Sequence, residues 1–121
     1  MTAADLATFE FDRRERATIV RIHGEVDLSN AERLHDELSS RVGEAPWLVL
    51  DLAGCDYLDS AGLSAIAMIH ARCRGRGVHL RIVVPTSAAT IDRVLSITGM
   101  DMVLQVDRSI DEALAPADAA G

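Results

Sequence analysis

Aromatic residues are scarce in this chain: Phe, Trp and Tyr together make up 3% of its 121 residues. A core built from this sequence must therefore be aliphatic, and a hydrophobic content of 49% is enough to bury one. Basic residues are outnumbered, with twelve Lys and Arg against nineteen Asp and Glu, which gives a net charge of −7. This balance argues against nucleic acid and against an anionic membrane surface, because both are bound through basic side chains.

Cysteine is almost absent as well. Cys55 and Cys73 form no CxxC pair, so we expect two buried thiols in a reducing cytosol. The histidines show no metal-ligand spacing with one another or with the cysteines, so we expect no metal and no cofactor. Residues 1–5 carry no basic, apolar leader, and no apolar run approaches the ~20 residues that span a bilayer. We therefore expect a cytoplasmic protein.

Common catalytic motifs are also missing. The chain has neither the Gly-x-Ser-x-Gly elbow of serine hydrolases nor a Walker A phosphate loop. The sequence thus favours a binding module over an enzyme.

Short runs of β-formers bounded by turn residues predict the strands. The predicted strands are 6–11, 17–23, 47–52, 78–84 and a short one at about 102–106. The first two should pair as a hairpin, and strands then alternate with helices. This order predicts an α/β fold with a mixed sheet of about four to five strands and crossover helices.

Apolar residues three and four positions apart predict the helices. In the first, Ser29 with Glu32 fits a capping box, and Gly43 is expected just past the end. The remaining expected features are a helix from Ser60 closed by Gly75 and Gly77, a helix with Ile91, Val94 and Leu95, a short last helix capped by Ser109, and a fraying tail at 115–121.

The stretch 48–63, LVLDLAGCDYLDSAGL, organises the rest of the chain. A buried strand is followed by a loop containing Gly54 and Asp56, and an apolar helical pattern begins at Ser60. Ser60 should therefore lie near unpaired N–H groups and the positive end of a helix dipole. Its position alone allows two interpretations, an N-cap residue or a site that carries a phosphate.

Three short motifs favour the second interpretation through a family resemblance. Residues 59–63, DSAGL, resemble the phosphorylation loop of STAS-domain anti-sigma factor antagonists. Residues 24–27, GEVD, and 97–100, ITGM, resemble two further motifs of that family, in its order and at its intervals, and the similarity spans about 6–114. The resemblance implies one STAS domain over 1–121, with a core at about 6–114 and a single layer of helices mainly on one face.

The same resemblance assigns the candidate site. It implies that Ser60 is the phosphate acceptor. The implied partner-facing residues are Asp27, Asp59, Ser60, Ala61, Gly62, Leu63 and Ser64. Asp27 would lie near Ser60 if its strand neighbours the central one; turn and cap chemistry is the alternative interpretation of both aspartates. Relatives usually carry Ser or Thr at position 61, so Ala61 leaves Ser60 as the unambiguous acceptor, whereas Ser64, where many relatives have Gly, is a possible second one.

The implied function is regulation by partner exchange. Unphosphorylated, such a protein, a monomer when free, binds an anti-sigma factor and releases a sigma factor. The anti-sigma factor, or a related one, acts as the serine kinase with its own ATP and Mg²⁺, and a PP2C-like phosphatase resets the switch. Two alternatives remain: a STAS module in a stressosome-like scaffold or a lipid-transport accessory, and a small enzyme or nucleotide-binding protein that uses Asp27, Asp59 and Ser60.

Overall fold

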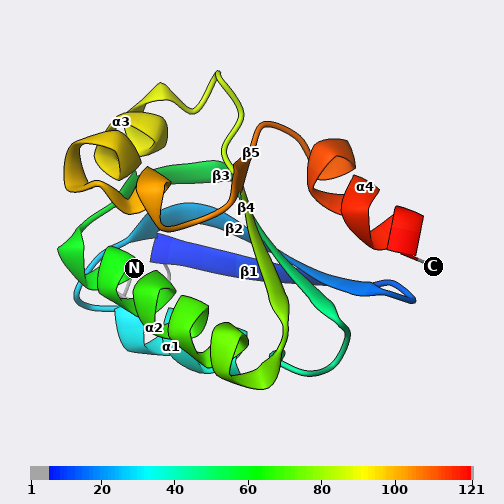
Figure 1. Cartoon of the computed structure of the whole chain (residues 1–121). Helices are drawn as coiled ribbons and strands as arrows, with labels where there is room; N and C mark the ends of the chain where they lie inside the picture. Colours follow the sequence, from blue (N-terminus) through cyan, green and yellow to red (C-terminus); the bar gives the residue numbers. More distant parts are fainter. Residues whose placement is uncertain (1–5, 121) are drawn as a thin grey trace.

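The sheet begins with an antiparallel hairpin, as predicted, in the computed structural model, which describes residues 6–120. The strands are β1 (Ala7–Arg13), β2 (Ala17–Val26), β3 (Trp47–Leu58), β4 (His79–Val83) and β5 (Val106–Asp107). From β3 onward each strand runs parallel to the one before it, and the spatial order is β1-β2-β3-β4-β5 (Figure 1). The predicted mixed sheet is therefore confirmed.

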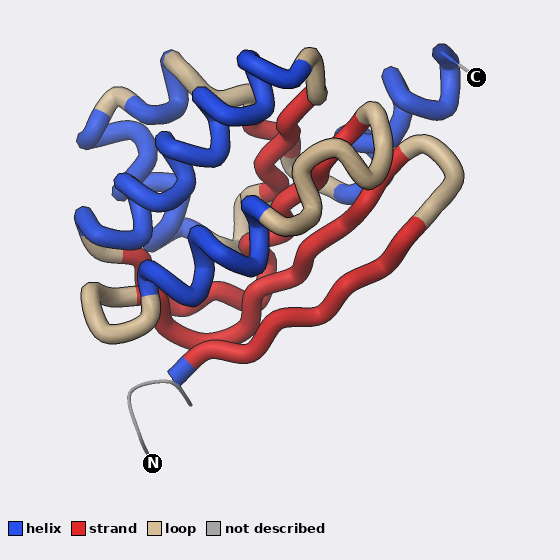
Figure 2. Tube along the Cα trace, turned by 90° about the horizontal axis from the view of Figure 1, so that it is seen from below, coloured by secondary structure: helices blue, strands red, loops and turns tan. Residues whose placement is uncertain are grey.

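Helices cover both faces of this sheet unequally. They are α1 (Ala31–Ser39), α2 (Ser60–Arg76), α3 (Ala89–Thr98), the 3₁₀ helix η2 (Met100–Met102) and α4 (Ile110–Ala120). The first three α-helices share one buried cluster with the sheet, whereas α4 packs in a second cluster on the opposite face. Figure 2 shows the strands as one layer with most of the helices on one side of it. This confirms the expected layer of helices mainly on one face.

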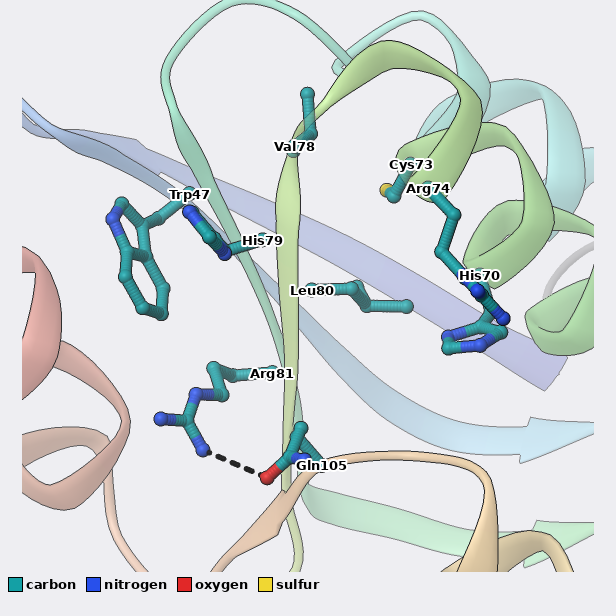
Figure 3. A pocket seen from close by; sticks show the side chains of 9 residues that line it. All are labelled: Trp47, His70, Cys73, Arg74, Val78, His79, Leu80, Arg81 and Gln105. Atoms are coloured by element: carbon teal, nitrogen blue, oxygen red, sulfur yellow. Dashed lines mark hydrogen bonds between the residues drawn. The ribbon is translucent and has the colours of Figure 1, made fainter.

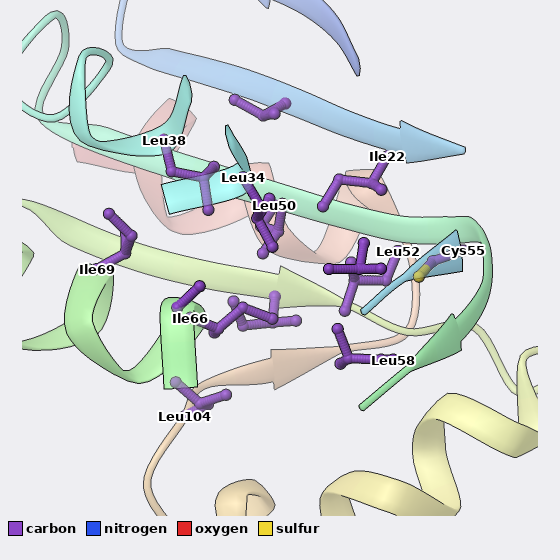
Figure 4. Close-up of a cluster of buried hydrophobic side chains, with 14 of the residues drawn as sticks. Ile22, Leu34, Leu38, Leu50, Leu52, Cys55, Leu58, Ile66, Ile69 and Leu104 are labelled. Atoms are coloured by element: carbon purple, nitrogen blue, oxygen red, sulfur yellow. The ribbon is translucent and has the colours of Figure 1, made fainter. Parts of the chain in front are cut away.

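The buried residues of the main cluster are aliphatic apart from two cysteines, as the shortage of aromatic residues requires, and the second cluster adds Trp47 to its aliphatic side chains. Along β3, Leu50 and Leu52 point to the face covered by α1, α2 and α3 (Figure 4), as does Leu48, whereas Val49, between Leu48 and Leu50, points to α4. This alternation is the period of a strand buried on both sides, which explains why the run is almost continuously apolar.

The central strand is longer than predicted. Residues 53–58 were expected as a loop, but they extend β3 and pair with the end of β2. Two register shifts lie in this part, so that residues 51–58 of β3 face only residues 21–26 of β2. Such bulges disturb the alternation of side chains between faces. The extension thus carries the loop-like residues Gly54 and Asp56 inside a strand.

The start and end of α1 also differ from the prediction. The helix begins after Asn30, and Ser29 forms no capping box, because both its amide and its hydroxyl donate to Asp27. The helix ends at Ser39, before the apolar pattern does, and Gly43 takes a left-handed φ of 98° in the turn that follows. The glycine is needed there, but for a turn beyond the helix rather than for the helix end itself.

The C-terminal part contains a displaced strand and a longer helix. Part of the strand expected at 102–106 is the end of η2, and β5 begins only at Val106. The Ser109 hydroxyl accepts from the Glu112 amide at 3.1 Å, which confirms the predicted cap of α4. The helix then continues through 115–120, where a fraying tail was expected, with Ala117 buried and its carbonyl bonded to Arg16. Gly121 lies outside the described residues.

Candidate functional site

The carboxyl ends of β2 and β3 bring the two predicted aspartates to one edge of the sheet. Val26 pairs with Leu58 at the ends of these parallel strands, and Asp27 and Asp59 follow them directly. The Asp59 amide donates to the Val26 carbonyl at 3.2 Å, which ties one loop to the strand that carries the other. The expectation that Asp27 comes near the Ser60 loop through neighbouring strands is therefore confirmed.

Asp59, not Ser60, is the N-cap of α2. Its Oδ1 accepts from the Ala61 amide at 2.9 Å and from the Gly62 amide at 3.0 Å, while its own backbone is extended. This confirms the cap interpretation for Asp59 and shows that the cap interpretation for Ser60 was wrong. Ser60 is the first helical residue, exposed, and within residues 6–120 its hydroxyl forms no hydrogen bond.

The Asp27 loop is held by its own side chains. Asp27 Oδ1 accepts from the Ser29 amide at 2.8 Å and from the Ser29 hydroxyl. The Ser29 hydroxyl, followed by its amide, holds the Asp27 pKa below 3.8. Asn30, which is buried, accepts from the Asp27 amide at 3.0 Å and donates to the Glu25 carbonyl at 2.9 Å. A fixed, charged carboxylate therefore stands beside the start of α2.

Gly62 and Leu63 lie inside the molecule rather than on the expected partner-facing surface. A Cβ on Gly62 would be 2.5 Å from Leu58 Cδ1 and 3.0 Å from Val26 Cγ1, so only glycine fits between α2 and the strand ends. Leu63 is 8% exposed and belongs to the main core cluster. These two residues therefore hold the first turn of α2 against the ends of the strands.

Ser64 is exposed one turn after Ser60 and lies in a groove between α1 and α2. The groove is lined by Ala31, Glu32, His35, Ala61, Ser64, Ala65 and Met68. Met68 is 58% exposed, and Leu28, beside Asp27, is 82% exposed. Leu28 was not among the partner-facing residues predicted from the sequence, although an apolar side chain between Asp27 and Ser29 in a turn is visible there.

The surface at the start of α2 combines the exposed Ser60 hydroxyl with the Asp59 carboxylate that caps the helix, next to the strand end that carries Asp27. Among the described residues, no group of three or more His, Cys, Asp or Glu side chains is placed to hold a metal ion. None of the described helices has both the length and the apolar character needed to cross a bilayer.

Comparison with known proteins identifies relatives over nearly the whole chain. The family model described as the STAS domain matches residues 8–113. The anti-sigma-F factor antagonist RsfA of Mycobacterium tuberculosis is 30% identical over 104 residues, covering 84% of this chain and 80% of the relative. RsfB of the same organism, also an anti-sigma-F factor antagonist, is 27% identical over 115 residues, with coverages of 94% and 92%.

Solved structures show the same architecture. An anti-sigma factor antagonist from Mycobacterium paratuberculosis superposes with a TM-score of 0.83 at 25% identity, over 98% of this chain and 99% of that one. Unphosphorylated SpoIIAA, an anti-sigma factor antagonist, gives a TM-score of 0.75 at 14% identity, over 93% and 97% of the two chains. The SpoIIAA likeness concerns the fold alone.

Proposed function

The chain belongs to the STAS domain family, and on that basis we propose that it acts as an anti-sigma factor antagonist switched by phosphorylation of Ser60. The observation that carries the proposal is the Ser60 hydroxyl. It is exposed, free of hydrogen bonds within the described chain, and fixed at the start of α2 by the Asp59 cap. An acceptor that must enter a kinase active site needs this accessibility.

In its unphosphorylated form the protein binds an anti-sigma factor and thereby releases a sigma factor. We assign the contact surface to Asp27, Asp59, Ser60, Ala61 and Ser64, with Gly62 and Leu63 supporting it from inside. The anti-sigma factor, or a related one, is the serine kinase and supplies ATP and Mg²⁺, and a PP2C-like phosphatase reverses the reaction. The protein itself is then a single-domain binding module in the cytoplasm, monomeric when free, and not an enzyme.

Phosphorylation would block this surface by charge. A phosphoserine adds about −1.5 to −2 charges at neutral pH. A helix N-terminus normally stabilises such a group through free N–H groups. Here Asp59 already occupies the amides of Ala61 and Gly62, and its carboxylate stands in the same turn. The phosphate therefore meets repulsion with little compensation, so the interface is lost without unfolding of α2.

The first experiment locates the acceptor. A pull-down from the native cytosol with unmodified protein identifies the kinase partner, and the protein is then incubated with that partner and ATP. Peptide mass mapping should find one phosphoryl group, on Ser60, since Ala61 offers no competing hydroxyl. Phosphate found chiefly on Ser64 would assign the switch to the second exposed serine instead.

The second experiment measures the switch. Calorimetry with the captured anti-sigma factor should show that phosphorylation weakens binding about a hundredfold, which corresponds to ~2.7 kcal/mol. Ser60→Ala should bind like the wild type and resist inactivation, and Ser60→Asp should bind poorly. Full-strength binding by the phosphorylated protein would refute the block. NMR shifts of the free proteins check that the helix is intact in every form.

A further inference from the structure

The first half of β4 is an open sheet edge. β5 pairs with β4 only at Ile82 and Val83, so within residues 6–120 no strand lies beside the preceding residues on that side. The His79 amide donates toward β3, to the Pro46 carbonyl, whereas the Ile82 amide donates the other way, to Gln105. Residues two apart in a strand direct their backbone groups to the same edge. The amide and carbonyl of Leu80 therefore point to the same edge as those of Ile82, at a point that β5 does not reach.

A hollow of about 390 Å³ lies over this edge. The β4-edge hollow is lined by Trp47, His70, Cys73, Arg74, Val78, His79, Leu80, Arg81 and Gln105. Four consecutive lining residues, 78–81, place it over the edge of the strand rather than over one face. Figure 3 shows Trp47, His79 and Arg81 on one side of the strand and Leu80 and the end of α2 on the other. At ~3.3 Å per residue, the edge offers room for three or four residues of an extended chain.

The charged lining of the hollow is positive in an otherwise acidic protein. Among the described residues it is lined by two arginines and two histidines and by no Asp or Glu. Arg81 is already engaged, since it lies 3.5 Å from Asp107 and donates to the Gln105 side chain at 3.2 Å. Arg74 is exposed, and no carboxylate in residues 6–120 pairs with it. The guanidinium fork of Arg74 is thus available to a carboxylate from outside.

We propose that the β4-edge hollow binds an extended acidic segment of a partner protein, which adds to β4 as a short strand. Main-chain hydrogen bonds to Leu80 would provide affinity, and acidic side chains directed at Arg74 would provide selectivity. Pairing with a second copy is disfavoured, because a twofold axis through this edge would bring two positive linings together. α2 has 17 residues, so its two ends, at ~1.5 Å per residue, lie roughly 25 Å apart, and the hollow is separate from Ser60.

The test uses a short capped peptide of alternating Glu and Val, with the same peptide carrying Lys for Glu as its control. Titrated into isotope-labelled protein, the acidic peptide should shift the Leu80 amide saturably and slow its hydrogen exchange, leaving the Ser60 amide unchanged. The Lys peptide should bind at least tenfold more weakly. Equal affinity for both peptides, or no saturable shift at Leu80 with millimolar peptide, would overturn the proposal.

A charge-reversal pair supplies the matched control. Arg74→Glu should weaken the acidic peptide at least tenfold, whereas Arg93→Glu, an equal charge change at an exposed position of α3, should not. Thermal unfolding of both variants checks that the fold is kept. A Leu80 shift that grows with protein concentration in the absence of peptide would assign the edge to a second copy and contradict the proposed occupant.

Discussion

At the residue scale, Asp59 caps α2 while its neighbour Ser60 remains exposed. Asp59 satisfies two amides of the first helical turn, which leaves the Ser60 hydroxyl without a structural duty. A serine that capped the helix itself would exchange its hydroxyl cap for a phosphate cap on phosphorylation, and the start of the helix would change with it. The arrangement therefore lets the chemical state of Ser60 change while the start of α2 stays the same.

A first prediction separates the cap from the acceptor. Asp59→Ala should lower the free energy of unfolding by about 1 kcal/mol, because two amides lose their acceptor. Ser60→Ala, the adjacent control, should change it by less than about 0.5 kcal/mol, as expected of an exposed residue without bonds. Asp59→Asn should keep the stability, since Asn caps as well as Asp. Urea unfolding measures all three, and a larger loss for Ser60→Ala than for Asp59→Ala would contradict the assigned cap.

A second prediction concerns the charge of Asp27. Its carboxyl should titrate below 3.8 in the folded protein, because Ser29 donates two hydrogen bonds to it. An acid whose pKa is lowered by folding contributes stability that is present above pH 3.8 and lost as the pH falls through the folded pKa. NMR titration should show the pKa rising toward 3.8 in Ser29→Ala, which removes the hydroxyl, and staying unchanged in Ser64→Ala. An unchanged pKa in Ser29→Ala would disprove the stated cause.

At the element scale, the strands that the sequence predicts best are those with a regular period. The core of β3, 47–52, is visible because it is apolar on both faces. Its extension, 53–58, is invisible because two register shifts turn the buried positions into Leu52, Cys55 and Leu58, three residues apart. A spacing of three favours neither a strand nor a loop in the sequence.

The candidate site was likewise predictable only in part. The Ser60 motif and the two aspartates are visible in the sequence, and the order of the strands brings them together. The identity of the cap was not, because Asp and Ser are both good N-caps and stand next to each other. Nor was the burial of Leu63, since a helix of alternating small and apolar residues does not reveal which side faces the core.

A third prediction compares two glycines of α2. Gly62→Ala should destabilise the protein by about 1–3 kcal/mol, because the new methyl group displaces buried Leu58. At Gly75 no neighbouring atom lies within 4 Å of an added Cβ, so Gly75→Ala should stabilise the protein by about 0.5–1 kcal/mol through helix propensity. Urea unfolding of the two variants gives the comparison. If both substitutions changed the free energy of unfolding in the same direction, the close packing around Gly62 would not be what excludes a larger residue there.

At the scale of the whole molecule, both thiols belong to the core that joins the sheet to its main helix layer. Cys55 and Cys73 are both buried in the larger cluster, and the Cys55 thiol donates to the Tyr57 carbonyl at 3.3 Å. Burial raises the pKa of each thiol to about 11. The folded protein therefore keeps both thiols protonated, so their reactivity reports unfolding of the whole domain.

A fourth prediction follows for alkaline solutions. Above pH 9.0 the thiols of the unfolded chain lose their protons, while those of the folded protein retain them up to about 11. Stability should therefore decrease as the pH rises between these values. All twelve basic residues are arginines, so no lysine titrates in this window. The urea midpoint should decrease less in the Cys55→Ala, Cys73→Ala double variant; an equal decrease would exclude the thiols as the cause.

The stacking of Trp47 on His79, with ring centroids 4.3 Å apart, has a practical consequence. Trp47 is the only tryptophan and lies in the β4-edge hollow, while Tyr57, the only tyrosine, is 46% exposed and lies just before Asp59. Each end of the molecule thus carries one natural chromophore of a different kind. Indole emission should report occupation of the sheet edge, and the tyrosine ring should report events around Ser60. One unlabelled sample can therefore distinguish which of the two surfaces a partner has engaged.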